Sequence, residues 1–93
     1  MIEGGCNCGA VRYRIEGLPL AVAACHCTRC RRQSGSAFSV NLVVLEAAMT
    51  VSGALSSFKD EDTTSGEPVY REFCGTCGSP IRSLLSSPAG LVA

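Results

Sequence analysis

Cys74-Gly75-Thr76-Cys77-Gly78 has the form of a zinc knuckle, a tight turn that presents two sulfur atoms to one metal ion. The glycine after the second cysteine suits a backbone that needs positive φ. A redox Cys-x-x-Cys motif is the rival interpretation, but such a motif normally opens a helix beside a βαβ pattern, and neither is visible here. The stretch therefore favours metal ligation.

Two more cysteine clusters precede this knuckle, Cys6-Asn7-Cys8 and Cys25-His26-Cys27-Thr28-Arg29-Cys30. Thiolate clusters with such short spacing select zinc. Of the seven cysteines in the chain, four fill one tetrahedral site and three remain. Three protein ligands with an open position are the usual form of a reactive zinc site. The sequence thus predicts one closed and one open zinc site, although the spacing alone leaves open which clusters share an ion.

The first cluster must bend to bind a metal. Alternate Cα atoms in a flat strand are about 6.5–7 Å apart, whereas tetrahedral zinc needs sulfur atoms about 3.8 Å apart. Gly4, Gly5 and Gly9 supply the backbone freedom for that bend. Ligands from near both ends of the chain would then hold the domain closed.

In the middle cluster, we expect Thr28 to cap a short helix over residues 29–34 that ends at Gly35. Cys30 then lies in the first turn, where the helix dipole favours a thiolate. His26 is the only histidine and a candidate fourth ligand, but neighbours in extended backbone point to opposite sides. We therefore expect His26 to pack nearby rather than to bind the metal.

Three arginines belong to the same stretch, Arg29, Arg31 and Arg32. They would partly offset the charge of three thiolates, and they are candidates to receive an anionic ligand such as a carboxylate. A solvated helix face is an equally open interpretation of each of them.

A chain of 93 residues is one small domain that buries roughly 60–65% of the surface its unfolded chain exposes. Bound zinc can add about 10–16 kcal/mol of apparent binding free energy to such a marginal core. A disulfide framework is disfavoured by the odd cysteine count, the close spacings and the lack of a signal peptide. We therefore expect a reducing, cytoplasmic setting.

The formal net charge is zero, and seven thiolates with two zinc ions would change it to about −3. No basic excess remains to attract a nucleic-acid backbone. No apolar run approaches the ~20 residues that a membrane helix needs. Neither nucleic acid nor a membrane is an expected partner.

Short apolar and alternating segments separated by turn residues predict a small, mainly β fold of antiparallel strands with one short helix, stapled by metal. We expect an acidic, solvated hairpin loop at residues 60–67 and one helical turn at 46–49. The expected strands are 10–16, 20–24, 37–45, 49–51, 55–59, 68–73 and 81–85.

Three motifs together resemble the glutathione-dependent formaldehyde-activating enzyme family. They are Cys6-Asn-Cys-Gly-Ala-Val-Arg-Tyr13, the segment from Cys25 to Phe38, and Phe73-Cys-Gly-Thr-Cys-Gly-Ser-Pro-Ile81. They occur in the order and with the spacing of that family, and they are spread over most of the chain.

The resemblance implies an Mss4-like fold with two zinc ions. It assigns the structural zinc to Cys6, Cys8, Cys74 and Cys77. It assigns a second, catalytic zinc to Cys25, Cys27 and Cys30. The implied reaction joins glutathione to formaldehyde to give S-(hydroxymethyl)glutathione, and in reverse the enzyme is a carbon–sulfur lyase. The implied partners are therefore a small thiol such as glutathione and a small aldehyde.

Members of this family usually run further past the last Cys-x-x-Cys, so we expect residues 1–93 to be a single zinc domain truncated at its C-terminus. We further expect an exposed strand edge near that terminus that would favour a homodimer. Two other functions stay open: a non-catalytic zinc module of Mss4-like fold that binds a partner, and a metal-free redox switch at Cys25, Cys27 and Cys30.

Overall fold

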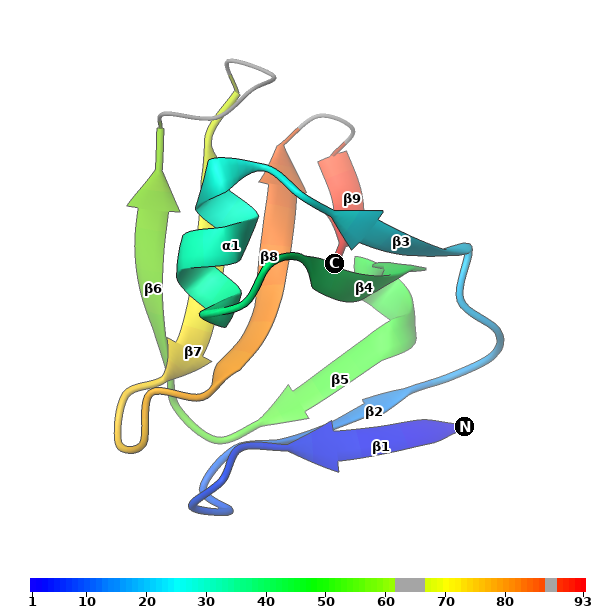
Figure 1. Cartoon of the computed structure of the whole chain (residues 1–93). Helices are drawn as coiled ribbons and strands as arrows, with labels where there is room; N and C mark the ends of the chain where they lie inside the picture. The colour runs from blue at the N-terminus through cyan, green and yellow to red at the C-terminus, as the bar shows by residue number, and fades with distance from the viewer. Residues whose placement is uncertain (62–66, 87–88) are drawn as a thin grey trace.

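The computed structural model of the chain describes residues 1–61, 67–86 and 89–93, and it is mainly β, as the sequence predicts. Among the described residues, strands dominate and one α-helix and one 3-10 turn complete the fold (Figure 1). The N-terminal half contains β1 (Ile2–Gly5), β2 (Arg12–Ile15), β3 (Ala21–Cys25), α1 (Thr28–Ser34) and β4 (Ser39–Leu45). The C-terminal half contains η1 (Glu46–Ala48), β5 (Met49–Ser52), β6 (Leu55–Asp60), β7 (Val69–Cys74), β8 (Pro80–Ser86) and β9 (Ala89–Val92).

The strands form two antiparallel sheets. A three-stranded sheet has the order β1-β2-β5, and a six-stranded sheet has the order β3-β4-β9-β8-β7-β6. Figure 1 shows the small sheet below the large one, with α1 lying across the face of β7 and β8. The chain therefore crosses from one sheet to the other several times, so that its N-terminal and C-terminal strands belong to a single folded unit.

The core is small and divides into two clusters. One consists of Ile15, Val44 and Val92 and joins the two sheets. The other consists of Cys6, Val11 and Cys74, and so contains two predicted metal ligands. Because two of its three buried members are cysteines, this cluster buries little apolar surface of its own.

Most expected elements are confirmed. The predicted strands appear with ends shifted by one or two residues, and the predicted helical turn is η1. Gly35 ends α1 with a left-handed φ of 67°, and its N–H bonds to the carbonyl of Arg31, as a helix C-terminus requires. Sequence reasoning missed β1 and β9, which are short and contain glycines that weaken a strand signal.

The expected exposed strand edge near the C-terminus is wrong. Strand β9 lies between β4 and β8, with Val92 opposite both Val44 and Leu84. The edges of the six-stranded sheet are β3 and β6. Since both sides of β9 are paired, that strand offers no edge for a second copy of the chain.

The expected solvated acidic loop is wrong at its first residue. Asp60 ends β6, is only 3% exposed, and accepts a hydrogen bond from Arg71. Glu61 and Glu67 are exposed, as expected, and residues 62–66 lie outside the described residues. A buried carboxylate needs a charged partner, and that partner comes from β7, 11 positions along the chain. The local sequence does not reveal such pairing.

None of the helices among the described residues has the length and apolar character that crossing a lipid bilayer demands.

The turn after β5 gives a stability prediction. Gly53 has a φ of 101°, and a Cβ there would collide with the carbonyl oxygen of Ala10. Gly17 has a φ of 77° but faces open space. Gly17→Ala should therefore lower the free energy of unfolding by only about 1–2 kcal/mol, the cost of a left-handed backbone at alanine. Gly53→Ala should lower it by about 3 kcal/mol or more, because the steric overlap with Ala10 adds to that backbone cost. Urea unfolding of both variants with zinc present tests this prediction. Equal losses of unfolding free energy in the two variants would contradict the close approach of Gly53 to Ala10.

Candidate metal centres

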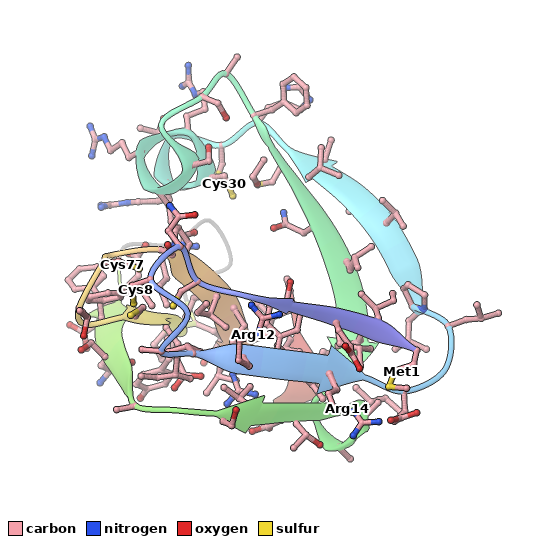
Figure 2. All side chains as sticks on the ribbon, turned by 90° about the horizontal axis from the view of Figure 1, so that it is seen from below. Met1, Cys8, Arg12, Arg14, Cys30 and Cys77 are labelled. Atoms are coloured by element: carbon pink, nitrogen blue, oxygen red, sulfur yellow. The ribbon has the colours of Figure 1, made fainter. Side chains whose placement is uncertain are left out.

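The outer clusters meet in one four-cysteine group, and the middle cluster forms a separate group. The ligand atoms of Cys6, Cys8, Cys74 and Cys77 all lie within 4.8 Å of one another, and so do those of Cys25, Cys27 and Cys30. The structure thus answers the question of pairing that the spacing left open. In Figure 2, Cys8 and Cys77 lie close together near one end of the molecule, whereas Cys30 lies on the helix.

Two turns build the four-cysteine group. After β1 the chain turns so that the N–H of Gly9 bonds to the carbonyl of Cys6, at 3.2 Å, which is the bend the spacing demanded. After β7 the N–H of Gly78 bonds to the carbonyl of Cys74, at 2.8 Å, and forms the knuckle. The Ser79 hydroxyl joins the two turns, accepting from the N–H of Asn7 at 3.1 Å.

The sulfur spacing of this group suits tetrahedral zinc. Cys8 Sγ lies 3.5 Å from Cys6 Sγ and 3.7 Å from Cys74 Sγ, close to the about 3.8 Å that four Zn–S bonds of about 2.3 Å imply. Four cysteines, with no carboxylate or histidine of the described residues among them, form a closed, soft donor set. The residues present therefore fit a structural zinc ion.

Hydrogen bonds from backbone N–H groups and a hydroxyl favour the charged form of two of these sulfur atoms, those of Cys6 and Cys77. The N–H of Val11 donates to Cys6 Sγ at 3.3 Å and lowers the pKa of Cys6. The Ser79 hydroxyl, 3.2 Å from Cys77 Sγ, together with the Ser79 N–H lowers the pKa of Cys77 to about 5. Such donors orient and stabilise metal-bound thiolates, which is a second reason why this group fits a metal.

The three-cysteine group is built where β3 runs into α1. Cys25 is the last residue of β3, Cys27 precedes the helix, and Cys30 is the third helical residue, in the first turn as expected. Cys25 Sγ and Cys27 Sγ are 3.5 Å apart, again a spacing suited to zinc. The three sulfur atoms are half-buried and converge, and within residues 1–61, 67–86 and 89–93 no fourth cysteine, histidine or carboxylate joins them, so they form an open donor set.

The expected cap at Thr28 is wrong, because the cap is Cys27. Its sulfur accepts from the N–H of Cys30 at 3.3 Å, and this bond lowers the pKa of Cys27 to about 7. Burial and the neighbouring thiols raise the pKa of Cys30 to about 12. Sequence reasoning favoured threonine because hydroxyls are the usual caps, and it overlooked that a ligand sulfur can also accept this bond.

The histidine and the three arginines that the sequence singled out lie outside the three-cysteine group. His26 is exposed, outside the three-sulfur group, and its ring lies 5.2 Å from that of Phe38. Arg31 and Arg32 are exposed, as a solvated helix face predicts. Arg29 instead reaches back to the buried Asp60, with Nε 3.9 Å from Oδ1. Nothing in the sequence around Arg29 signalled that partner.

A cavity of about 430 Å³ lies beside α1 and between the sheets. Its polar lining includes Gln33 from α1, Ser39 and Asn41 from β4, and Arg82 from β8. Ser39 also hydrogen-bonds the Cys30 side chain and accepts from Asn41 Nδ2 at 3.0 Å. The cavity and the three-cysteine group therefore meet at Ser39, although none of the three cysteines lines the cavity. The volume of the cavity falls in the range of small-molecule pockets.

Comparisons with known proteins identify relatives in sequence and in fold. A protein of Halomonas elongata named "Putative glutathione-dependent formaldehyde-activating enzyme" is 33% identical over 85 residues, covering 87% of this chain and 54% of that protein. The chain thus spans about half the length of that curated relative. A crystal structure of a Rhodobacter sphaeroides protein, a Northeast Structural Genomics target, shares the fold with a TM-score of 0.74 at 23% identity. That match covers 98% of this chain and 81% of the other.

The model of the family described as glutathione-dependent formaldehyde-activating enzyme matches residues 1–92. The match includes all seven cysteines, from the bend after β1 to the knuckle after β7. The chain belongs to the glutathione-dependent formaldehyde-activating enzyme family.

Proposed function

We propose that the chain binds zinc at both cysteine groups and adds glutathione to formaldehyde at the three-cysteine group, forming S-(hydroxymethyl)glutathione. In the reverse direction this is a carbon–sulfur lyase reaction. The observation that supports the proposal best is the open set of three sulfur atoms at Cys25, Cys27 and Cys30, beside a polar cavity. Family membership supports the substrates.

The reaction needs little covalent work from the protein. One carbon–sulfur bond forms between the thiol sulfur and the formaldehyde carbon, and the thiol proton ends on the former carbonyl oxygen. Zinc bound at this group would supply a Lewis-acidic position at which a thiol loses its proton readily near neutral pH. The contribution of the chain is to hold the donor set open and to orient the thiol.

Individual residues have distinct parts in this proposal. The N–H of Cys30 fixes the Cys27 sulfur, and the Ser39 side chain does the same for Cys30. In the cavity, Asn41 and Gln33 offer amide groups suited to the peptide bonds of glutathione. Arg82 is held at 2.6 Å by Glu72, so its charge is largely balanced before any ligand enters.

The same proposal includes the remaining properties of the chain. Residues 1–93 would form one zinc domain in which Cys6, Cys8, Cys74 and Cys77 hold a structural ion. All seven cysteines are free thiols in the structure, and they must stay reduced to bind metal. We therefore infer a reducing, cytoplasmic setting.

Glutathione titration of the zinc-loaded chain tests the function. We expect saturable binding by calorimetry, and faster loss of free formaldehyde than with glutathione alone, followed by NMR. The uncatalysed addition must be subtracted, because thiols add to formaldehyde unaided. S-methylglutathione is the control ligand, and it should bind far more weakly since it has no thiol proton to lose. A chain with two zinc ions that binds neither compound would contradict the enzyme and favour a non-catalytic zinc module.

A further inference from the structure

Helix α1 contains Cys30 and begins directly after Cys27, so it positions two of the three sulfur atoms, yet little apolar packing holds it. The helix has only seven residues, and none of them is buried. A helix of this length is unstable in isolation, and most helices in proteins gain their stability from a buried apolar face. Something other than a hydrophobic face must therefore fix the orientation of α1.

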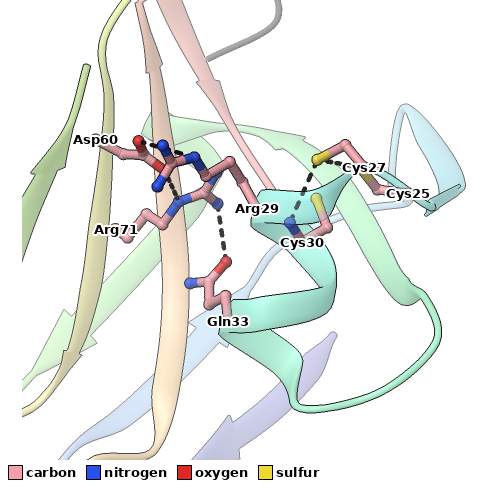
Figure 3. Close-up of polar contacts among 7 residues, drawn as sticks. All are labelled: Cys25, Cys27, Arg29, Cys30, Gln33, Asp60 and Arg71. Carbon is pink, nitrogen blue, oxygen red and sulfur yellow. Dashed lines mark hydrogen bonds and ion pairs between the residues drawn. The ribbon is translucent and has the colours of Figure 1, made fainter. Parts of the chain in front are cut away.

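A polar network lies between α1 and the β6–β7 hairpin. Arg71 of β7 donates through Nε to Asp60 Oδ2 at 2.9 Å and through Nη1 to Gln33 Oε1 at 2.8 Å. Arg29 approaches the other carboxylate oxygen of Asp60. Figure 3 shows this network on one side of the helix and the three cysteines on the other.

The network contacts the helix at two positions on one face. Arg29 and Gln33 are four residues apart, so they lie one above the other on the helix surface. The side chains of Asp60 and Arg71 are only 4% and 14% exposed. Charge-assisted hydrogen bonds in such a shielded place are stronger and more directional than those on a wet surface.

We propose that the network of Asp60, Arg71, Gln33 and Arg29 positions α1 so that Cys27 and Cys30 converge with Cys25 on one metal ion. This inference rests on the proposed function, because it requires metal at the three-cysteine group. Asp60 and Arg71 hold the helix from outside and Gln33 is the helix residue that Arg71 contacts, so all three are positioning residues rather than ligands. Mutation of the residues that orient metal ligands commonly lowers metal affinity by about 10- to 100-fold.

Gln33→Ala is the sharpest test. The substitution removes the acceptor for Arg71, while alanine is the better helix former, so any loss cannot come from helix propensity. We expect the zinc affinity of the three-cysteine group to fall by about 10- to 100-fold, measured by chelator competition. The affinity of the four-cysteine group in the same molecule should stay unchanged and serves as the internal reference.

Two further variants separate positioning from general stability. Gln33→Glu keeps an oxygen acceptor for Arg71 and should retain zinc affinity close to that of the wild type. Glu72→Gln weakens a different partly buried ion pair, Glu72 of β7 with Arg82 of β8, whose side chains are 16% and 15% exposed. We expect that variant to leave the three-cysteine group unchanged.

The outcomes are distinct. Full zinc affinity in Gln33→Ala, or an equal fall at both groups, would overturn the inference while leaving the proposed function intact. A wild-type chain that binds only one zinc ion would overturn the proposed function, and the positioning role with it. Weaker zinc binding in Gln33→Ala, recovered in Gln33→Glu, is the result we expect.

Discussion

Cys74→Ser should prevent the chain from folding at 25 °C, whatever the zinc concentration. Cys74 is only 1% exposed and lies in the core cluster beside Cys6 and Val11. Structural zinc contributes about 10–16 kcal/mol of apparent binding free energy, which matches or exceeds the about 5–15 kcal/mol of net stability of typical domains. A serine there loses the ligand and leaves a hydroxyl in the core.

The core supports this expectation. Among the described residues, the buried apolar side chains are Cys6, Val11, Ile15, Val44, Cys74 and Val92, and two of these six belong to the four-cysteine group. Without metal, the remaining apolar burial is small against the entropy cost of ordering the chain.

Circular dichroism and thermal melting test the expectation. Cys74→Ser, and the wild type treated with a strong chelator, should both lose the cooperative transition. Cys25→Ser is the matched control, since it removes a ligand of the other group and should keep the transition. A chelated wild-type chain that melts cooperatively at its original temperature would show that the fold does not depend on metal.

Cys27→Ser should remove the second zinc ion and leave the fold intact. Serine is among the preferred helix caps, so it can accept the bond from the Cys30 N–H that Cys27 accepts now. The substitution therefore separates the two roles of Cys27, since it retains a cap and removes a thiolate. We expect glutathione affinity to fall by at least about 100-fold, beyond the range typical of groups outside the ligand set.

Cys27→Ala is the companion variant because it removes both roles. It should lose the same zinc ion as Cys27→Ser and be less stable by about 1 kcal/mol, the usual worth of a cap. Thr28→Ala should change neither property, since the cap is Cys27. A Cys27→Ser protein with two zinc ions and full glutathione binding would contradict the assignment of the open site.

The sequence predicts much of the site because metal geometry is local. Spacings of one or two residues force Cys6 with Cys8 and Cys74 with Cys77 into single turns, whatever the rest of the chain does. Alternation likewise locates most strands, as in β2, where Tyr13 and Ile15 face inward and Arg12 and Arg14 face solvent. These features depend on neighbours along the chain.

The features that sequence reasoning missed depend on distant partners. The local sequence of Asp60 is typical of a loop. Only the folded structure places Arg71 and Arg29 beside its carboxylate. Strand β9 has too few residues to show a period, and only its pairing with β4 and β8 defines it. Gln33 shows no signal in the sequence, because its partner Arg71 is 38 positions away.

The zinc-to-protein ratio of the chain purified under reducing conditions tests the central claim most directly. Elemental analysis with a protein concentration from amino-acid analysis gives the ratio without assuming any activity. Two filled cysteine groups predict a ratio near two, falling to one in Cys27→Ser. A ratio near one in the wild type, unchanged after zinc is added and the sample is dialysed, would contradict the open metal site. Only the four-cysteine group would then bind zinc.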